Sequence, residues 1–548
     1  MAVTMTMAET FTTMMVAIGC QALLSPIPEP STITIISTYL STNCILFSYL
    51  TLTKDRIFQS IIHLFSLNAI FLITAFILTA FRRLYFSPLS HIPGPTRFAL
   101  TKLFIANEYR LGRTSHTIEA LHREYKSDVV RIGPNEVSVV NVDAVAKVFA
   151  GKYPRGTFYE IGAINGEFNL NTTRDYGKHT PWRRIWEKAF VSSASREYNT
   201  RVEIHVDKMV QILLKADGKE VNVSKAVDNL TFDIMADLSF SKHAGLQDGT
   251  GDNSYMSYLH KYMSFAGIVG ALRNLAQLLA YIPETSEIRT FREKGETMLK
   301  ERQERGSTYR DIFSYLLSAD SEGGEKFTQK ELNSNANLII VAGADTSSST
   351  VTQTLRALAK EPRILSKLQS EIDEVCTTIG EGDEITIDSI QNLEYLNAVV
   401  NEGLRLYNPV PSGAHATTYP QGVEVEGIYI PGNVQVEVPH LVLMKDERYF
   451  AQSKEFIPER WTSERPELVK DRRAYIPFGY SVHSCVGKTL ALQELRLVVA
   501  RIVRTFDIQF GPSHDEAVFE SEWKDYVAVK IGNLWLRFLP RKLDDIAT

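Results

Sequence analysis

The residue best suited to chemistry is Cys485, which lies in the run Tyr475–Lys488 just before an amphipathic helical pattern. Unpaired N–H groups and the positive end of the helix dipole stabilise a thiolate at such a position. Phe478 stands seven residues before this cysteine, and Gly487 stands two residues after it. The pattern therefore predicts a thiolate with a lowered pKa that can bind a metal ion. The alternative is a structural thiol, since free cysteine is commonly a small buried residue.

An acidic and a hydroxyl residue lie in the middle of a second helical pattern. This pattern begins at a capping box formed by Thr328 and Glu331 and continues to Lys360, so it predicts one helix that crosses the body of the protein. In its centre, Asp345 is followed by Thr346, a pair suited to delivering protons to an apolar site. The alternative is a helix packed closely on a neighbour, with the acid in an ion pair.

Two small residues, Ala342 and Gly343, precede this pair and leave room beside the helix. A glycine and a threonine at positions 343 and 346 can also loosen the helical hydrogen-bond ladder. We therefore expect a local groove at this point of the helix.

Charged side chains form two further groups with helical spacing. Glu402 and Arg405 share one helix face, and an isolated pair of this kind is usually a surface ion pair worth about 0–1 kcal/mol. His179 and Arg183 lie in a segment that predicts a helix starting near Pro181. The alternative for this second group is a solvated cationic helix face.

Together these residues resemble the motifs of the cytochrome P450 family, in the family's order and with compatible spacing. Phe478, Cys485 and Gly487 match its haem-binding signature, Phe-x-x-Gly-x-Arg-x-Cys-x-Gly. Two positions depart from the signature. His483 replaces the usual arginine and is still able to donate to a haem propionate. Ser481 replaces a glycine that permits a tight backbone bend.

The resemblance implies a role for each matched residue around the haem. Cys485 would be the axial thiolate of haem b, whose electron donation favours O–O cleavage. Thr346 would hold dioxygen by a hydrogen bond, and Asp345 would relay protons. Ala342 and Gly343 would lie against the haem.

The remaining matches concern the haem edge and the protein frame. By resemblance, His179 and Arg183 would donate to a haem propionate, for which arginine offers a permanent charge and two parallel donors. Glu402 and Arg405 would be completed by Arg460 from a later Pro-Glu-Arg segment. Such a buried triad is a structural lock and has no catalytic role.

Composition limits the function classes. The chain has 548 residues and a net charge of −5, without a sustained basic segment, so nucleic acid is not an expected partner. The four cysteines, at positions 20, 44, 376 and 485, have neither the spacing of a disulfide framework nor that of a zinc site.

Residues 1–86 predict a membrane anchor. Ile57–Phe81 contains no Asp, Glu, Lys or Arg and is long enough to span a bilayer. The basic pair Arg82–Arg83 follows it and favours a cytosolic location for the rest of the chain. Ser31–Thr53 is a second uncharged segment able to span. Phe11–Leu24 is short for a span and predicts an interfacial or signal-like segment.

Residues 87–95 contain three prolines and predict a stiff, extended hinge. Residues 96–548 predict a mainly α-helical domain with small accessory β-sheets, which is the cytochrome P450 fold if the resemblance holds. The expected strands are Val129–Ile132 with Glu136–Val140, and Val423–Tyr429 paired with Val434–Val438 through an Ile-Pro-Gly-Asn turn.

The resemblance implies a monooxygenase that inserts one oxygen atom from O2 into a small apolar organic substrate. Its electrons would come from NADPH through NADPH–cytochrome P450 reductase, which basic residues at positions 184, 188 and 488 could contact. The anchor and hinge resemble those of fungal members of secondary metabolism, located in the endoplasmic reticulum membrane with a cytosolic catalytic domain and lipid as a partner. The alternatives are xenobiotic oxidation, an oxygen-independent haem-thiolate isomerase or dehydratase, and a non-catalytic membrane protein.

Substrate contacts are expected at four places. These are the loop from about Arg155 to Asn171, including Phe158, Tyr159, Ile161 and Phe168; the helix positions Leu338 and Ala342; the turn Val410–Ala414; and a C-terminal loop near Phe519.

Overall fold

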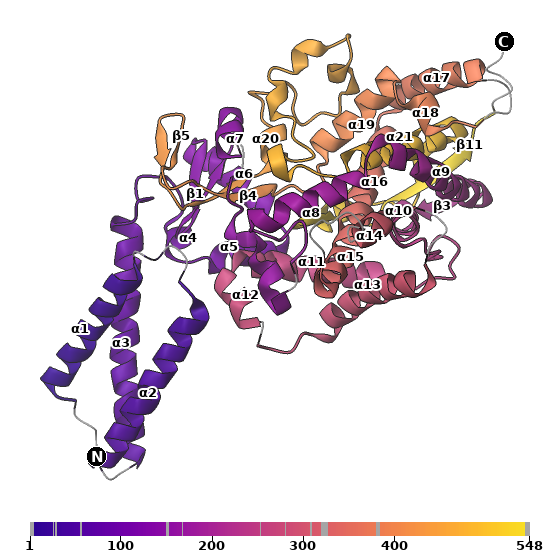
Figure 1. The fold of residues 1–548 in the computed structure, drawn as a ribbon. Coiled ribbons are helices and arrows are strands. Elements are labelled where there is room, and N and C mark those ends of the chain that lie inside the picture. Colours follow the sequence, from indigo (N-terminus) through magenta and orange to yellow (C-terminus); the bar gives the residue numbers. More distant parts are fainter. Residues whose placement is uncertain are drawn as a thin grey trace.

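The computed structural model describes residues 5–542 except for 26, 28–29, 55–56, 150–152, 167, 253, 280, 307–309, 319–326 and 380–383. The outer limits predicted for the anchor and for the catalytic domain, residues 1 and 548, lie outside the described residues. Three N-terminal helices project from a mainly helical body, which has small sheets both near these helices and at its opposite end (Figure 1).

The projecting helices are α1 (Met7–Leu24), α2 (Thr32–Lys54) and α3 (Ile57–Tyr85). All three are long and apolar enough to cross a membrane. The expectation that Phe11–Leu24 is too short was wrong, because a capping box at Thr6 starts α1 four residues before Phe11. The helices pack on one another, and polar side chains link them: Asn68 Nδ2 donates to Asn43 Oδ1 at 2.6 Å.

Residues 87–95 differ from the predicted extended hinge, because they form successive turns that are docked on the body. Leu89 and Ile92 are buried in a core cluster with the first sheet. Arg131 holds this segment from the body side, since its guanidinium donates to the Arg83 carbonyl at 3.0 Å and to Ser87 Oγ at 3.2 Å.

The helices of the body are α4 (Thr96–Leu100), α5 (Leu103–Leu111), α6 (Thr114–Tyr125), α7 (Val142–Val148), η1 (Thr157–Gly166), α8 (Tyr176–Lys188), α9 (Ser192–Lys215), α10 (Val223–Phe240), α11 (Ser254–Ala271), α12 (Arg273–Leu279), α13 (Ser286–Arg305), α14 (Ile312–Ser318), α15 (Gln329–Ile340), η3 (Val341–Asp345), α16 (Thr346–Lys360), α17 (Pro362–Ile379), α18 (Ile387–Ile390), α19 (Glu394–Leu406), α20 (His440–Met444), η4 (Pro458–Trp461), η5 (Pro466–Leu468), η6 (Arg472–Ala474), η7 (Ser481–His483), α21 (Lys488–Thr505) and α22 (Glu516–Ser521). Helix α8 begins at Tyr176, earlier than predicted, because Asp175 caps it and Pro181 is accommodated inside the helix.

The strands are β1 (Val129–Gly133), β2 (Glu136–Val139), β3 (Glu220–Asn222), β4 (Ala414–Thr417), β5 (Val423–Val425), β6 (Ile428–Ile430), β7 (Gln435–Val438), β8 (Phe506–Phe510), β9 (Lys524–Tyr526), β10 (Ala528–Lys530) and β11 (Trp535–Pro540). They form one four-stranded sheet in the order β1-β2-β7-β4, one three-stranded sheet in the order β3-β11-β8, and two hairpins.

One predicted strand pair was wrong. The segment expected as the single strand Val423–Tyr429 is itself a hairpin of β5 and β6. Its turn residues Glu426 and Gly427 both have positive φ, which matches the twist of a tight hairpin. Strand β7 pairs instead with β2 and β4, so the Ile-Pro-Gly-Asn turn joins two different sheets.

The predicted central helix spans the expected residues but contains a π-helical segment. Helices α15 and α16 continue into each other through η3. In this π-helical segment the backbone hydrogen bonds span five residues where those of an α-helix span four, so the helix is locally wider. Residues 347–358 of α16 are all buried, and this helix packs against α10, α19 and α21. The loosened ladder expected at positions 343–346 therefore corresponds to a real widening of the helix at the middle of the core.

Candidate functional site

A cavity of about 630 Å³ lies between η3, α8, α11 and the segment that leads into α21. Nine of the sequence-predicted site residues line it: His179, Arg183, Ala342, Gly343, Thr346, Phe478, His483, Cys485 and Gly487. The predicted residues that do not line it are Asp345, behind the helix, and the structural triad.

Cys485 lies three residues before α21, and its side chain is exposed into the cavity. Its N–H donates to the Phe478 carbonyl at 2.8 Å, which closes the loop between these two residues. Burial by the surrounding protein raises the pKa of the thiol, while the Gly487 N–H and the charges of Arg183 and Lys488 oppose that effect. The predicted lowering of the pKa is thus outweighed by burial, but a bound metal ion deprotonates a coordinating thiol.

The backbone of this loop bends at two positions. Gly479 has φ 73°, and Ser481 has φ 59°, so both are in the left-handed region. A glycine adopts this region without steric cost, whereas serine does so at a cost of roughly 1 kcal/mol. Ser481 therefore takes the conformation for which the family signature has glycine, and the loop keeps its shape under local strain.

The cavity face of the central helix carries Ala342, Gly343 and Thr346. Thr346 Oγ1 donates to the Ala342 carbonyl at 2.6 Å, within the π-helical segment. A side chain at Gly343 would meet Met235 Sδ at 2.5 Å, so the glycine allows α10 to approach this helix closely. The central helix therefore presents hydroxyl side chains to the cavity at Thr346, Ser347 and Thr350, beside the small residues at positions 342 and 343.

Asp345 points away from the cavity and is buried against α11. Its Oδ1 lies 3.1 Å from Nε2 of His260. One alternative for this helix was that Asp345 forms an ion pair, and the structure contains that pair. The next residue, Thr346, does face the cavity. The sequence contained no local signal for His260, which lies 85 residues away.

His179 and His483 form a hydrogen-bonded pair at the cavity wall, with His483 Nδ1 3.0 Å from His179 Nε2. Burial, with the charges of Arg155 and Arg183, lowers the pKa of His179 to about 4. Burial, with the charge of Arg155 next in importance, lowers the pKa of His483 to about 2. Both rings are therefore neutral at neutral pH, and one nitrogen of His483 is already engaged by His179.

Two arginines lie beside this histidine pair. Arg183 donates from Nη1 to the Ser484 carbonyl at 2.5 Å and from Nε to Glu187 at 2.8 Å, so it ties α8 to the cysteine loop. Arg155 is buried, and within the described part of the chain its Nε and Nη1 have no acceptor. The sequence predicted Arg155 only as the start of a substrate-contact loop and not as a haem-site residue.

An unpaired buried guanidinium is costly unless an anion meets it. Arg155 lines the cavity close to His179 and His483, and its Nη2 is held by Asn171 at 3.2 Å. The guanidinium also lies over the Tyr159 ring, 3.8 Å from its centroid, so the cavity has a thiol on one wall and, at its edge, a cation with two nitrogens that have no acceptor among the described residues. This donor set fits a haem, whose iron takes a thiolate and whose propionates are anions.

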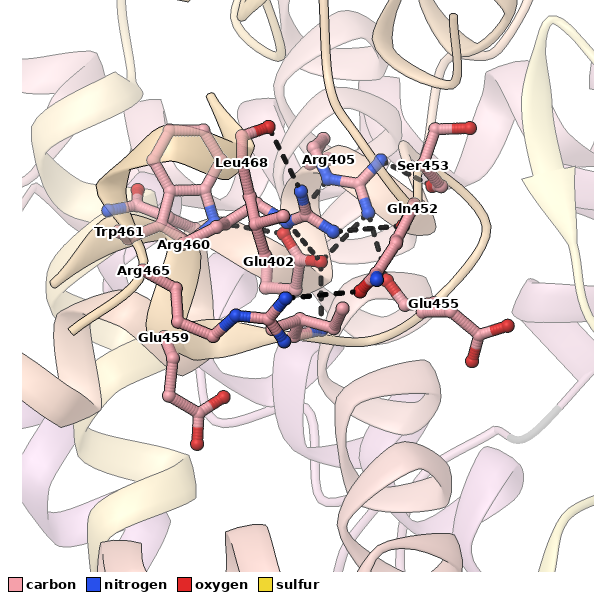
Figure 2. A network of polar contacts seen from close by, with 12 residues as sticks. Glu402, Arg405, Gln452, Ser453, Glu455, Glu459, Arg460, Trp461, Arg465 and Leu468 are labelled. Carbon is pink, nitrogen blue, oxygen red and sulfur yellow. Dashed lines mark hydrogen bonds and ion pairs between the residues drawn. The ribbon is translucent and has the colours of Figure 1, made fainter. Parts of the chain in front are cut away.

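The structure brings Glu402, Arg405 and Arg460 together in a fully buried network (Figure 2). Glu402 accepts two hydrogen bonds from Arg405, at 2.8 and 2.9 Å, and one from Arg460 at 3.0 Å. The carboxylate of Glu402 accepts two further hydrogen bonds, from Trp461 Nε1 at 2.9 Å and from the Ile457 N–H at 3.0 Å. The network joins α19 to η4 and supports the fold from outside the cavity.

Most of the expected substrate-contact positions line the cavity, including Phe158, Ile161 and Leu338. The C-terminal segment after Phe519 does reach the cavity, through Val527 and Ala528, whereas Phe519 itself is a core residue. Sequence reasoning also missed the apolar wall contributed by α11 and α13, which includes Tyr262, Met263, Ile288 and Phe291.

A buried acid at the cavity was also missed. Glu494 on α21 accepts a hydrogen bond from Ser347 at 3.1 Å, and among the described residues no group donates to its Oε1. Burial raises the pKa of Glu494 to about 8, so it is mainly protonated at neutral pH. The available signal was an acidic residue on the otherwise apolar face of α21.

Comparisons with known proteins agree with this geometry. The family model for cytochrome P450 matches residues 93–534. Cytochrome P450 monooxygenase FCK2 of Fusarium pseudograminearum is 32% identical, with 84% of this chain and 83% of that protein covered. Tryprostatin B 6-hydroxylase of Aspergillus fumigatus is 30% identical, covering 82% and 80%.

Among solved structures, the haem domain of cytochrome P450DA is similar in fold, with a TM-score of 0.69 and 20% identity over 83% of this chain and 98% of that one. Members of the family are oxidoreductases that hold a haem through a cysteine thiolate. The chain belongs to the cytochrome P450 family.

Proposed function

We propose that this protein is a membrane-anchored monooxygenase that inserts one oxygen atom from O2 into an apolar organic substrate in fungal secondary metabolism. The single observation that carries the proposal is that Cys485, Thr346 and residues of the π-helical segment line one cavity. The similarity to fungal monooxygenases, among them a tryprostatin B hydroxylase, supports the reaction class.

Different residues at the cavity would bind different parts of the haem. Cys485 would bind the haem iron, and Phe478 and Gly487 would pack beside the sulfur. Arg155, Arg183 and the neutral His179–His483 pair would receive the propionates. When bound, a thiolate-ligated haem supplies the activation of dioxygen.

The chain's own contribution to the reaction is proton control and exclusion of water. The Thr346 hydroxyl, now bonded to the Ala342 carbonyl, needs only a rotation about its side chain to donate into the cavity. Asp345 would supply protons from behind the helix. Aromatic and aliphatic side chains from η1, α11 and α13 form an apolar lining that suits an apolar substrate.

Electrons would come from NADPH through a flavoprotein reductase. Arg184, Lys188 and Lys488 are all exposed near the start of α21 and the end of α8, where they could meet an acidic partner. The three N-terminal helices would hold the protein in the endoplasmic reticulum membrane with the body in the cytosol, as Arg82 and Arg83 at the end of α3 favour.

The test is the spectrum of the reduced, carbon-monoxide-bound protein. Wild type should show the strongly red-shifted Soret band of a thiolate-ligated haem, and Cys485→Ala should lose it. A wild-type protein without this band, or a Cys485→Ala variant that keeps it, would overturn the assignment.

A spin-state titration with terpenoids, alkaloids, polyketides and aromatic compounds would then select a substrate. Product formation should require both NADPH and reductase. Turnover of that compound without NADPH would instead support an isomerase or dehydratase.

A further inference from the structure

Asp345 and His260 connect the central helix to α11 on the side away from the cavity. His260 Nε2 lies 3.1 Å from Asp345 Oδ1. The next residue along the chain, Thr346, faces the cavity. One turn of helix therefore has the substrate space on one side and an imidazole on the other.

His260 is the more accessible member of this pair. Its side chain is 21% exposed, whereas that of Asp345 is 4% exposed. Among the described residues, Asp345 Oδ2 has no hydrogen-bond partner. His260 thus holds one oxygen of a buried carboxylate, and it is the member of the pair with the larger exposure to solvent.

Among the described residues, the charged groups that act most strongly on His260 are Asp345 on η3, Asp228 on α10 and Lys530 on β10. Burial alone would lower the pKa of His260, but the charge and hydrogen bond of Asp345, with Asp228, raise it above the ordinary value, and Lys530 opposes them. Asp228 in turn accepts a hydrogen bond from Ser348, and burial raises its pKa to about 6.

We propose that His260 is a positioning residue that holds Asp345 and a proton relay that passes protons from solvent to it. This inference rests on the proposed function. In this step the Nε2–H bond of the imidazolium breaks and an O–H bond forms at Asp345 Oδ1. The neutral imidazole then takes a proton from solvent, so no electrons are exchanged and no co-reactant is needed. Rotation of the protonated Asp345 side chain then brings this proton to the side of the helix on which Thr346 faces the cavity.

The first test measures His260 itself, without turnover. Histidine C2 hydrogen–deuterium exchange, followed by mass spectrometry of the full-length protein in nanodiscs, gives the pKa of each histidine. The pKa of His260 should lie above that of an ordinary histidine in wild type and should fall in Asp345→Asn. An unshifted His260, or one that does not respond to Asp345→Asn, would overturn the proposal.

The second test measures coupling in the haem-loaded protein with reductase and the compound selected by spin-state titration. His260→Gln should lower product formed per NADPH about tenfold, less than loss of a direct acid–base group. The variant should also release more hydrogen peroxide per NADPH. In wild type, product formed per NADPH should fall as pH rises and His260 loses its proton, and this fall should be absent in His260→Gln. His260→Arg, which keeps a cation but cannot release a proton, should retain the fold and not the coupling.

His205→Gln is the matched control. His205 Nε2 lies 3.3 Å from Asp237 Oδ2, and neither residue lines the cavity, so coupling should not change. Equal coupling and equal pH profiles in His260→Gln and wild type would overturn the relay. Loss of the thiolate band in wild type would instead contradict the proposed function, and the exchange measurement on His260 would remain informative.

Discussion

Glu402 lies between two arginines, and both nitrogens of the Arg405 fork meet its carboxylate, at 2.8 and 2.9 Å, with all atoms of both side chains buried. Such a pair stabilises the fold, because removal of either partner would leave an uncompensated charge in the protein interior. Arg460 shares the same carboxylate from η4, so one acid holds together two segments that lie far apart in the sequence.

Glu402→Gln should therefore destabilise the protein strongly. The change leaves two buried guanidinium groups facing a neutral amide, which costs about 3–5 kcal/mol. Urea unfolding of the full-length protein in detergent measures the loss. Glu304→Gln is the control, because Glu304 pairs with Lys300 at 3.8 Å on the surface. An effect of equal size in both variants would contradict the role of the triad.

Ser481→Gly should relieve the strain beside Cys485. Ser481 has φ 59°, a conformation that costs a non-glycine residue roughly 1 kcal/mol. We expect slower haem loss and a higher Tm for the haem-loaded protein. Ser481→Ala keeps the strain and removes only the hydroxyl, so it should not stabilise. A Ser481→Gly variant with unchanged Tm and haem-loss rate would show that the loop carries no strain.

Arg155→Leu should weaken haem binding. Its buried guanidinium has two nitrogens without an acceptor among the described residues, and a propionate would be their natural partner. A charge-assisted hydrogen bond is worth about 1.5–3 kcal/mol, so haem transfer to apomyoglobin should be about 10- to 100-fold faster. Arg123→Leu, at an exposed position on α6, should not change the rate. Equal transfer rates in the two variants would exclude Arg155 from the haem site.

Glu494→Gln should change the dependence of stability on pH. Burial raises the pKa of this carboxyl from 4.5 to about 8, so the folded protein holds a proton that the unfolded chain releases. Stability should therefore fall as pH rises between these two values, by at most about 1.4 kcal/mol per pH unit from this group.

The variant should lack this part of the slope while keeping the amide's hydrogen bond to Ser347. Tm measured across the pH range gives the comparison. Parallel curves for wild type and Glu494→Gln would show that Glu494 is ionised in the folded state.

Local spacing was enough to predict much of the site. The family signature around Cys485, the acid–hydroxyl pair of Asp345 and Thr346, and the i,i+3 pair of Glu402 and Arg405 all depend on a few neighbouring residues. The capping box at Thr328 marked the start of the central helix correctly. These features are governed by helix geometry, which repeats within one or two turns and is visible in the sequence.

The partners of these residues were decided by the tertiary structure. His260 reaches Asp345 across 85 residues, and Arg155 comes to lie close to His179 and His483, which belong to later segments of the chain. Burial then set the balance of charge: it kept the two histidines neutral and raised the pKa of Cys485 against the expected helix effect. Sequence spacing therefore determined which groups could act, whereas packing between distant segments determined what each group faces and how well water reaches it.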